Sequence, residues 1–149
     1  MKIIDTLAAG VLGTTAFTVF SYLVSKREHK NYKEPDLLGI MAYRSMDMSK
    51  SQSEFTGWLS HYLIGVAFAG VYKLLINKTG MRSSLKNGFI AGAASGIPAI
   101  ISWDTGLKIH PRPPRNRSRE YYTQLFAGHI IFGVTCFLVF NAFEIRNKK

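Results

Sequence analysis

Four long apolar segments alternate with polar, strongly charged connections along this chain of 149 residues. The segments are 3–25, 55–76, 85–107 and 121–143. An α-helix needs about 20 mostly apolar residues to cross a hydrocarbon core about 30 Å thick, and each segment meets that length. A helix of a soluble bundle would show polar residues along one face, and Val11–Val24 and Ile130–Phe140 show no such charged stripe. The pattern predicts one all-α domain over 1–149, an integral membrane four-helix bundle.

The long first connection contains a shorter apolar run, Leu37–Tyr43, which cannot span a bilayer. It could form a short helix lying in the membrane interface or an ordinary loop packed across the mouth of the bundle. The sequence Ser51-Gln52-Ser53-Glu54 has the pattern of a capping box and predicts the start of the second long helix.

The formal net charge of +10 would suggest nucleic acid as a partner of a soluble protein. Here the basic residues lie in connections beside apolar segments, where they favour contact with anionic lipid headgroups. We therefore expect the lipid bilayer, and not nucleic acid, as the partner. Eleven Lys and Arg fall on the side of the first and third connections and eight on the other, a margin too small to fix the orientation.

Three glycines in the third apolar segment, Gly88, Gly92 and Gly96, are spaced four residues apart. Small residues at this spacing let a second helix approach closely, and packing is the main attraction between helices in lipid. The partner helix could belong to this chain, to a second copy in a homo-oligomer, or to a larger membrane complex. Pro98 follows and is expected to kink the helix.

Two histidines occur in similar surroundings in the second and fourth segments. The first lies in Ser60-His61-Tyr62-Leu63-Ile64-Gly65-Val66 and the second in Gly128-His129-Ile130-Ile131-Phe132-Gly133-Val134. Together with Ala9-Gly10 and Ala91-Gly92, they suggest two repeated helical hairpins, and sites tend to lie at the interface of such repeats.

Both histidines are ionisable side chains at membrane depth, where such groups usually face the bundle interior, a partner or a cavity. Counted along their helices, both lie roughly 9–12 Å from the same interface. Asp104 lies near that end of the third segment. We therefore expect His61, His129 and Asp104 to converge on one site.

Three roles for this site follow from the residue types. Each imidazole could form a hydrogen bond to a hydroxyl or carbonyl of another helix. His61 and His129 could bind haem b or a divalent metal, with Asp104 as a third ligand or as an outer hydrogen-bond acceptor, in an electron-transfer subunit. The histidines and Asp104 could also form a proton-sensitive element or belong to a small transporter.

No catalytic residue is expected, because the sequence contains no nucleophile elbow and no phosphate-binding glycine loop. The single cysteine, Cys136, is expected to be a small buried apolar residue.

Between Ser60 and Arg146 the chain resembles the YagU-like family of small bacterial inner-membrane proteins. The resemblance rests on His61, Phe68-Ala69, Tyr72, Gly88, Ala91-Gly92-Ala93, Phe126-Ala127-Gly128-His129-Ile130 and Glu144-Ile145-Arg146. It covers somewhat over half of the chain and implies a multi-pass helical protein of the bacterial inner membrane. It implies no reaction. We expect a non-enzymatic accessory or assembly component with a paired-histidine polar site in the bundle.

Overall fold

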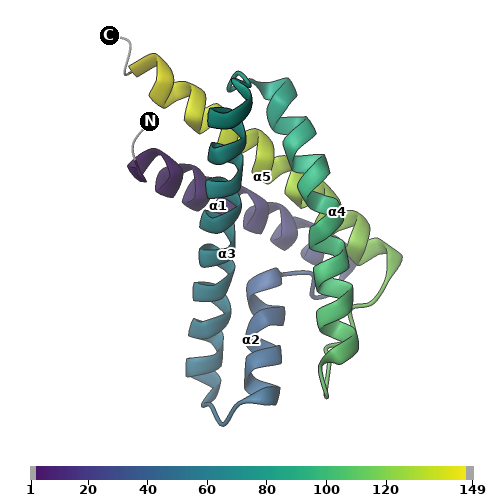
Figure 1. Ribbon diagram of the computed structural model, residues 1–149. Coiled ribbons are helices and arrows are strands. Elements are labelled where there is room, and N and C mark those ends of the chain that lie inside the picture. Colours follow the sequence, from purple (N-terminus) through teal and green to yellow (C-terminus); the bar gives the residue numbers. More distant parts are fainter. Residues whose placement is uncertain (1–2, 147–149) are drawn as a thin grey trace.

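The computed structural model describes residues 3–146, which form five α-helices and no strand (Figure 1). The helices are α1 (Ile3–Glu28), α2 (Glu34–Ser45), α3 (Lys50–Thr79), α4 (Leu85–Ile109) and α5 (Arg119–Arg146). The all-α prediction is confirmed, with one helix more than the four expected.

Three of the helices, α1, α3 and α5, are long and apolar enough to cross a membrane. Three of the four predicted spans therefore coincide with helices of sufficient length and apolar character. Helix α4 has sufficient length but is not among these three, and it contains Ser95, Pro98 and Asp104 besides its glycines. The outer surfaces of the helices nevertheless carry large apolar side chains, such as Val19, Leu63 and Leu138, which are exposed.

The four long helices alternate in direction, so that the start of α1 and the end of α5 lie on the same side of the molecule (Figure 1). Helix α5 packs against both α1 and α4, and α1 also packs against α3. Helices α3 and α4 do not form a packed pair. They are joined by a hydrogen bond of 2.6 Å between the hydroxyls of Tyr72 and Ser95.

The short apolar run of the first connection is a helix, α2, packed against α3. This contact is close because glycines meet: a Cβ on Gly57 of α3 would lie 2.6 Å from the backbone nitrogen of Gly39. Helix α3 begins at Lys50, and its capping box is formed by Ser49 and Gln52. The box expected at Ser51 therefore lies inside the helix, because Ser49 provides the same pattern two residues earlier.

Glycines also bring α4 against α5. A Cβ on Gly88 would lie 2.9 Å from the carbonyl oxygen of Gly133, and one on Gly92 would lie 2.6 Å from that of His129. A Cβ on Gly96 would lie 2.7 Å from the ring of Phe126. The helix facing these glycines thus belongs to the same chain. Helix α4 continues through Pro98.

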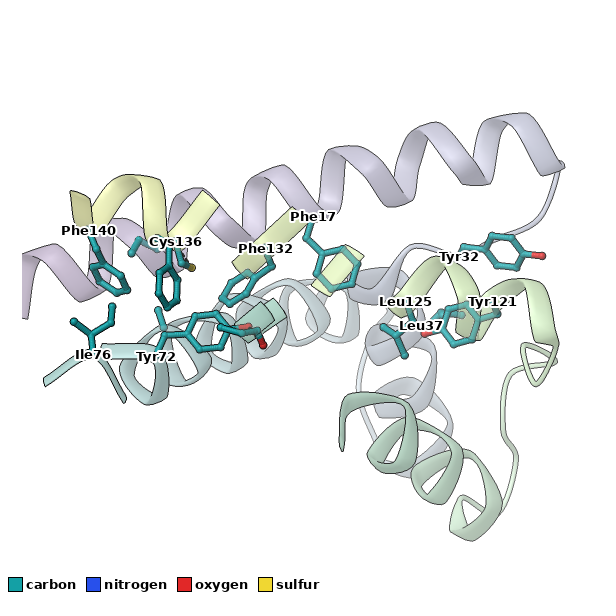
Figure 2. Packing of buried hydrophobic residues seen from close by; sticks show 14 residues of the cluster. Phe17, Tyr32, Leu37, Tyr72, Ile76, Tyr121, Leu125, Phe132, Cys136 and Phe140 are labelled. Atoms are coloured by element: carbon teal, nitrogen blue, oxygen red, sulfur yellow. Dashed lines mark hydrogen bonds between the residues drawn. The ribbon is translucent and has the colours of Figure 1, made fainter. Parts of the chain in front are cut away.

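Half of the core residues are aromatic (Figure 2). One row contains Phe17, Phe132 and Phe140, with Tyr72 and Ile76 opposite (Figure 2). A second group, near α2, consists of Tyr32, Leu37, Tyr121 and Leu125 (Figure 2). Cys136 is fully buried in the first group, and its thiol lies 3.3 Å from the carbonyl oxygen of Ala9. It is thus placed as a packing residue.

The pairs α1–α3 and α4–α5 are packed in the same register. A Cβ on Gly10 would lie 2.7 Å from Val66 Cα, and one on Gly88 would lie 2.9 Å from Val134 Cα. Each valine follows its histidine by five residues. Gly10 therefore corresponds to Gly88, whereas the sequence suggested Gly92, one helical turn further. The first pair is also not a simple hairpin, because α2 lies between its two helices in the chain.

Candidate functional site

His61 and His129 lie in the interior, each about 7% exposed, and neither faces the outer surface. Both imidazoles contact the ring of Phe17 on α1, at centroid distances of 5.9 Å and 5.3 Å respectively. The two imidazoles can therefore be no further apart than these two distances combined. In a compact four-helix arrangement, helix axes 8–10 Å apart predict that the two imidazoles lie within about 15 Å of each other, and the observed arrangement meets this distance.

The hydrogen bonds around His61 assign its tautomer. Its Nε2 lies 2.9 Å from the hydroxyl oxygen of Thr18. That hydroxyl has one proton, which it donates to the carbonyl oxygen of Thr14 at 2.8 Å. Thr18 must therefore accept from His61, so the imidazole proton is on Nε2. The Nδ1 atom forms no hydrogen bond within the described part of the chain and retains its lone pair.

His129 is held in the complementary way. Its Nδ1 lies 3.4 Å from the hydroxyl oxygen of Ser95 on α4. Ser95 donates to the carbonyl oxygen of Gly92 at 2.9 Å and can accept from the phenol of Tyr72. The proton of His129 is therefore assigned to Nδ1. Its Nε2 has no hydrogen-bond partner within residues 3–146.

These assignments predict opposite tautomers for the two histidines. In protein labelled with ¹⁵N-histidine and measured at pH 8, long-range ¹H–¹⁵N spectra should show His61 protonated on Nε2 and His129 on Nδ1. Replacing Thr18 with valine should mix the tautomers of His61, because the acceptor for its proton is removed. The matched change Thr15→Val, one turn earlier, should leave them unchanged. Identical tautomers in the wild type would contradict the assignment.

A cavity of about 300 Å³ lies beside both histidines and is lined by residues from all five helices. Its walls are largely aromatic, with Phe17, Phe68, Trp103 and Phe132 among the lining side chains. The ionisable groups that line it are His61, His129 and Glu34. Small-molecule sites are typically concave, mainly apolar spaces with a few polar groups, and this cavity has that character.

Glu34, at the start of α2, was not expected at the site. It is 3% exposed, and its carboxylate accepts hydrogen bonds from Ser21 Oγ at 2.6 Å and Gln124 Nε2 at 3.3 Å. Burial raises the pKa of Glu34 to about 7, although these two hydrogen bonds oppose the rise. In the sequence, a glutamate before Pro35 is typical of an exposed position at the start of a helix. The only sequence signal for its burial is the apolar run that follows.

Asp104 does not join the histidines. Its carboxylate binds Arg117 Nε at 3.0 Å and the Tyr122 hydroxyl at 2.8 Å, and it forms an ion pair with Lys108. It ties the end of α4 to the start of α5 and does not line the cavity. Between residues 3 and 146, no three His, Cys, Asp or Glu side chains are grouped so that they could hold a metal ion. The expected set of His61, His129 and Asp104 is therefore not assembled.

In comparisons with known proteins, no family model, curated protein or solved structure matches this chain.

Proposed function

We propose that this protein is a non-enzymatic accessory or assembly component of the bacterial inner membrane, and that its central cavity holds a small lipid-soluble molecule. The observation that carries the proposal is the cavity bounded by all five helices, in which Glu34, His61 and His129 meet aromatic walls. The hydroxyls that contact these three side chains belong to Ser21, Thr18 and Ser95, which are buried partners between helices. Within the described residues no three His, Cys, Asp or Glu side chains are grouped to hold a metal ion, whereas the surroundings suit binding.

Four membrane passes fit this proposal better than three. Helix α4 is packed into the bundle through its glycines, and its opposite face exposes Ile97 and Ile101, 57% and 60% respectively. Large apolar residues on that face suit lipid. An even number of passes also agrees with the start of α1 and the end of α5 lying on one side (Figure 1). The basic connections would then lie at anionic headgroups.

Membership of the YagU-like family is part of the same proposal. Two of the residues that carry the resemblance, His61 and His129, lie beside the cavity, and two others, Gly88 and Gly92, lie at the close contact of α4 with α5. The resemblance therefore includes residues of the cavity and of the contact between α4 and α5, which supports a shared architecture.

The proposal predicts that a small molecule co-purifies with the protein. Protein prepared in lipid nanodiscs should yield, on organic extraction and mass spectrometry, a molecule enriched over empty nanodiscs. Ala99 lines the cavity, and Ala99→Phe should deplete that molecule several-fold because the new ring fills the space. Ala94→Phe is the matched control, since Ala94 is exposed on the same helix and does not line the cavity. No enriched molecule, or equal depletion by both changes, would defeat the proposal.

A haem- or metal-binding role is the second candidate, and one observation favours it. Each imidazole donates its proton to a hydroxyl of another helix and leaves its other ring nitrogen free. Histidine ligands of metals are usually held in this way. The donor chemistry fits, with His61 and His129 as the two ligands, although no third ligand is grouped with them in residues 3–146. An absorption spectrum and elemental analysis of the same preparation decide the matter: a Soret band or a stoichiometric metal would replace the lipid-soluble molecule.

A further inference from the structure

We propose that the cavity binds an aromatic ring bearing two hydroxyl groups, as in a lipid-soluble hydroquinone, and that these hydroxyls donate hydrogen bonds to His61 Nδ1 and His129 Nε2. The inference rests on the proposed function and names the ligand class of the same cavity. It follows from the acceptors that the cavity presents, its walls and size, its access and its charge.

Each of the two histidines presents a hydrogen-bond acceptor, and not a donor, to a ligand in the cavity. His61 donates its ring proton to Thr18, and His129 donates its ring proton to Ser95. Each ring retains one nitrogen with a lone pair and no partner within the described residues. A ligand that satisfies both must carry two donor groups, because a buried polar atom without a partner is costly. A quinone, ether or ester has only acceptors and would leave both nitrogens unsatisfied.

The size and walls of the cavity favour a ring. Its volume of about 300 Å³ lies at the lower end of the range for small-molecule sites and excludes a whole lipid. Phe17 and Phe68 both lie edge-on to His129, at centroid distances of 5.3 Å each. Phe132 and Trp103 add further aromatic surface. Aromatic rings pack favourably against other aromatic rings in such edge-on or offset arrangements.

The cavity reaches the outer surface where α3 and α4 fail to pack together. Two of its lining residues, Ile64 on α3 and Ser102 on α4, are exposed. Ile64 follows His61 by three residues and so lies within the apolar part of α3. In a membrane this opening faces lipid, and a ligand that reaches the cavity through it must be soluble there.

Glu34 disfavours acidic ligands. Its carboxyl group lines the cavity from the α2 end and is held by Ser21 and Gln124. Above about pH 7, where Glu34 is ionised, a fatty acid would place a second carboxylate in the same low-dielectric space, where like charges repel strongly. A neutral dihydroxy ring avoids this repulsion.

The test is calorimetric titration of the full chain in nanodiscs, under argon, with trimethylhydroquinone as the probe. We expect saturable binding at one site. The dimethyl ether of the same compound should bind at least tenfold more weakly, because its oxygens cannot donate. His61→Leu and His129→Leu should each weaken binding about tenfold, the effect of losing one buried hydrogen bond. His110→Leu, a histidine outside the cavity, is the matched control and should bind like the wild type.

The ligand pair is measured on the wild type, so the proposal can fail even if a variant does not fold. Equal affinity for trimethylhydroquinone and its dimethyl ether would overturn it, as would tighter binding of oleic acid. Should the hydroquinone fail while Ala99→Phe still depletes an extracted molecule, the ligand class is wrong and the proposed function stands. Should neither bind nor be extracted, both are wrong.

Discussion

Replacing Gly92 with leucine should separate α4 from α5 and destabilise the protein by about 3 kcal/mol or more. A Cβ at this position would lie 2.6 Å from the carbonyl oxygen of His129 and 2.7 Å from Ile130 Cα. Both atoms belong to the backbone of α5, so no side-chain movement can relieve the overlap. The helices must move apart, and the packing that holds them in lipid is lost. Unfolding in mixed micelles, followed by circular dichroism, measures the change.

Gly70→Leu provides the control for that experiment. Gly70 lies within α3, and a Cβ there would have no neighbouring atom within 4 Å. The substitution should leave the free energy of unfolding unchanged or raise it slightly, because leucine favours a helix more than glycine does. If Gly92→Leu unfolds at the same denaturant concentration as Gly70→Leu, the close contact between α4 and α5 is wrong.

The free energy of unfolding of the wild type, measured relative to that of Glu34→Gln, should fall as the pH rises from 4 to 8. The pKa of Glu34 is raised from the ordinary value of 4.5 to about 7 by burial, so the folded state binds a proton more tightly than the unfolded state. Its contribution is fully present below pH 4.5 and is lost as the pH rises to about 7. The difference in pKa corresponds to about 3 kcal/mol. Denaturant unfolding at several pH values measures it.

The surroundings of Glu34 define what else could titrate there. Ser21 of α1 and Gln124 of α5 contact it, Tyr121 of α5 lies near, and Asp36 is the nearby acid on its own helix. Neither Ser21 nor Gln124 ionises. His61 and His129, which line the same cavity, are common to the wild type and to Glu34→Gln, so the difference between the two profiles reports on Glu34.

Glu54→Gln is the matched change, since Glu54 is exposed and its ion pair with Lys50 spans 3.9 Å. It should leave the pH dependence intact. A wild-type profile that Glu34→Gln does not alter would show that Glu34 is in water. A dependence on the Glu34 carboxyl near neutral pH would also favour the proton-sensitive role over a purely structural one.

The sequence was sufficient to predict the long helices and the burial of the histidines, because both depend on local pattern. Apolar runs of membrane length specify helices wherever they occur, and a histidine such as His61 inside one run is driven toward the interior. The four-residue spacing of Gly88, Gly92 and Gly96 indicated a face for another helix, and the sequence could not show that α5 provides it.

The errors arose where distant segments meet. Asp104 was expected beside the histidines because it lies near the correct end of its helix, but the basic residues Lys108 and Arg117 are closer and bind it. Glu34 was overlooked because its burial depends on Gln124, which lies 90 residues further along the chain. The sequence aligned Gly10 with Gly92, one helical turn away from Gly88. Short alanine-glycine pairs match by chance, whereas contact between the helix backbones sets the register.

The hydrogen bonds among Ser21, Glu34 and Gln124 constrain the order in which the helices can pack together during synthesis. Ser21 and Glu34 emerge from the ribosome early, while Gln124 comes from the last helix. Until α5 is inserted, the carboxylate of Glu34 lacks one of its two donors and the wall that buries it. Water is then the better solvent for it, so α2 should stay at the membrane surface until the final helix arrives. Docking of α2 would therefore close the bundle only once α5 is in place, and a product truncated before α5 would leave this helix undocked.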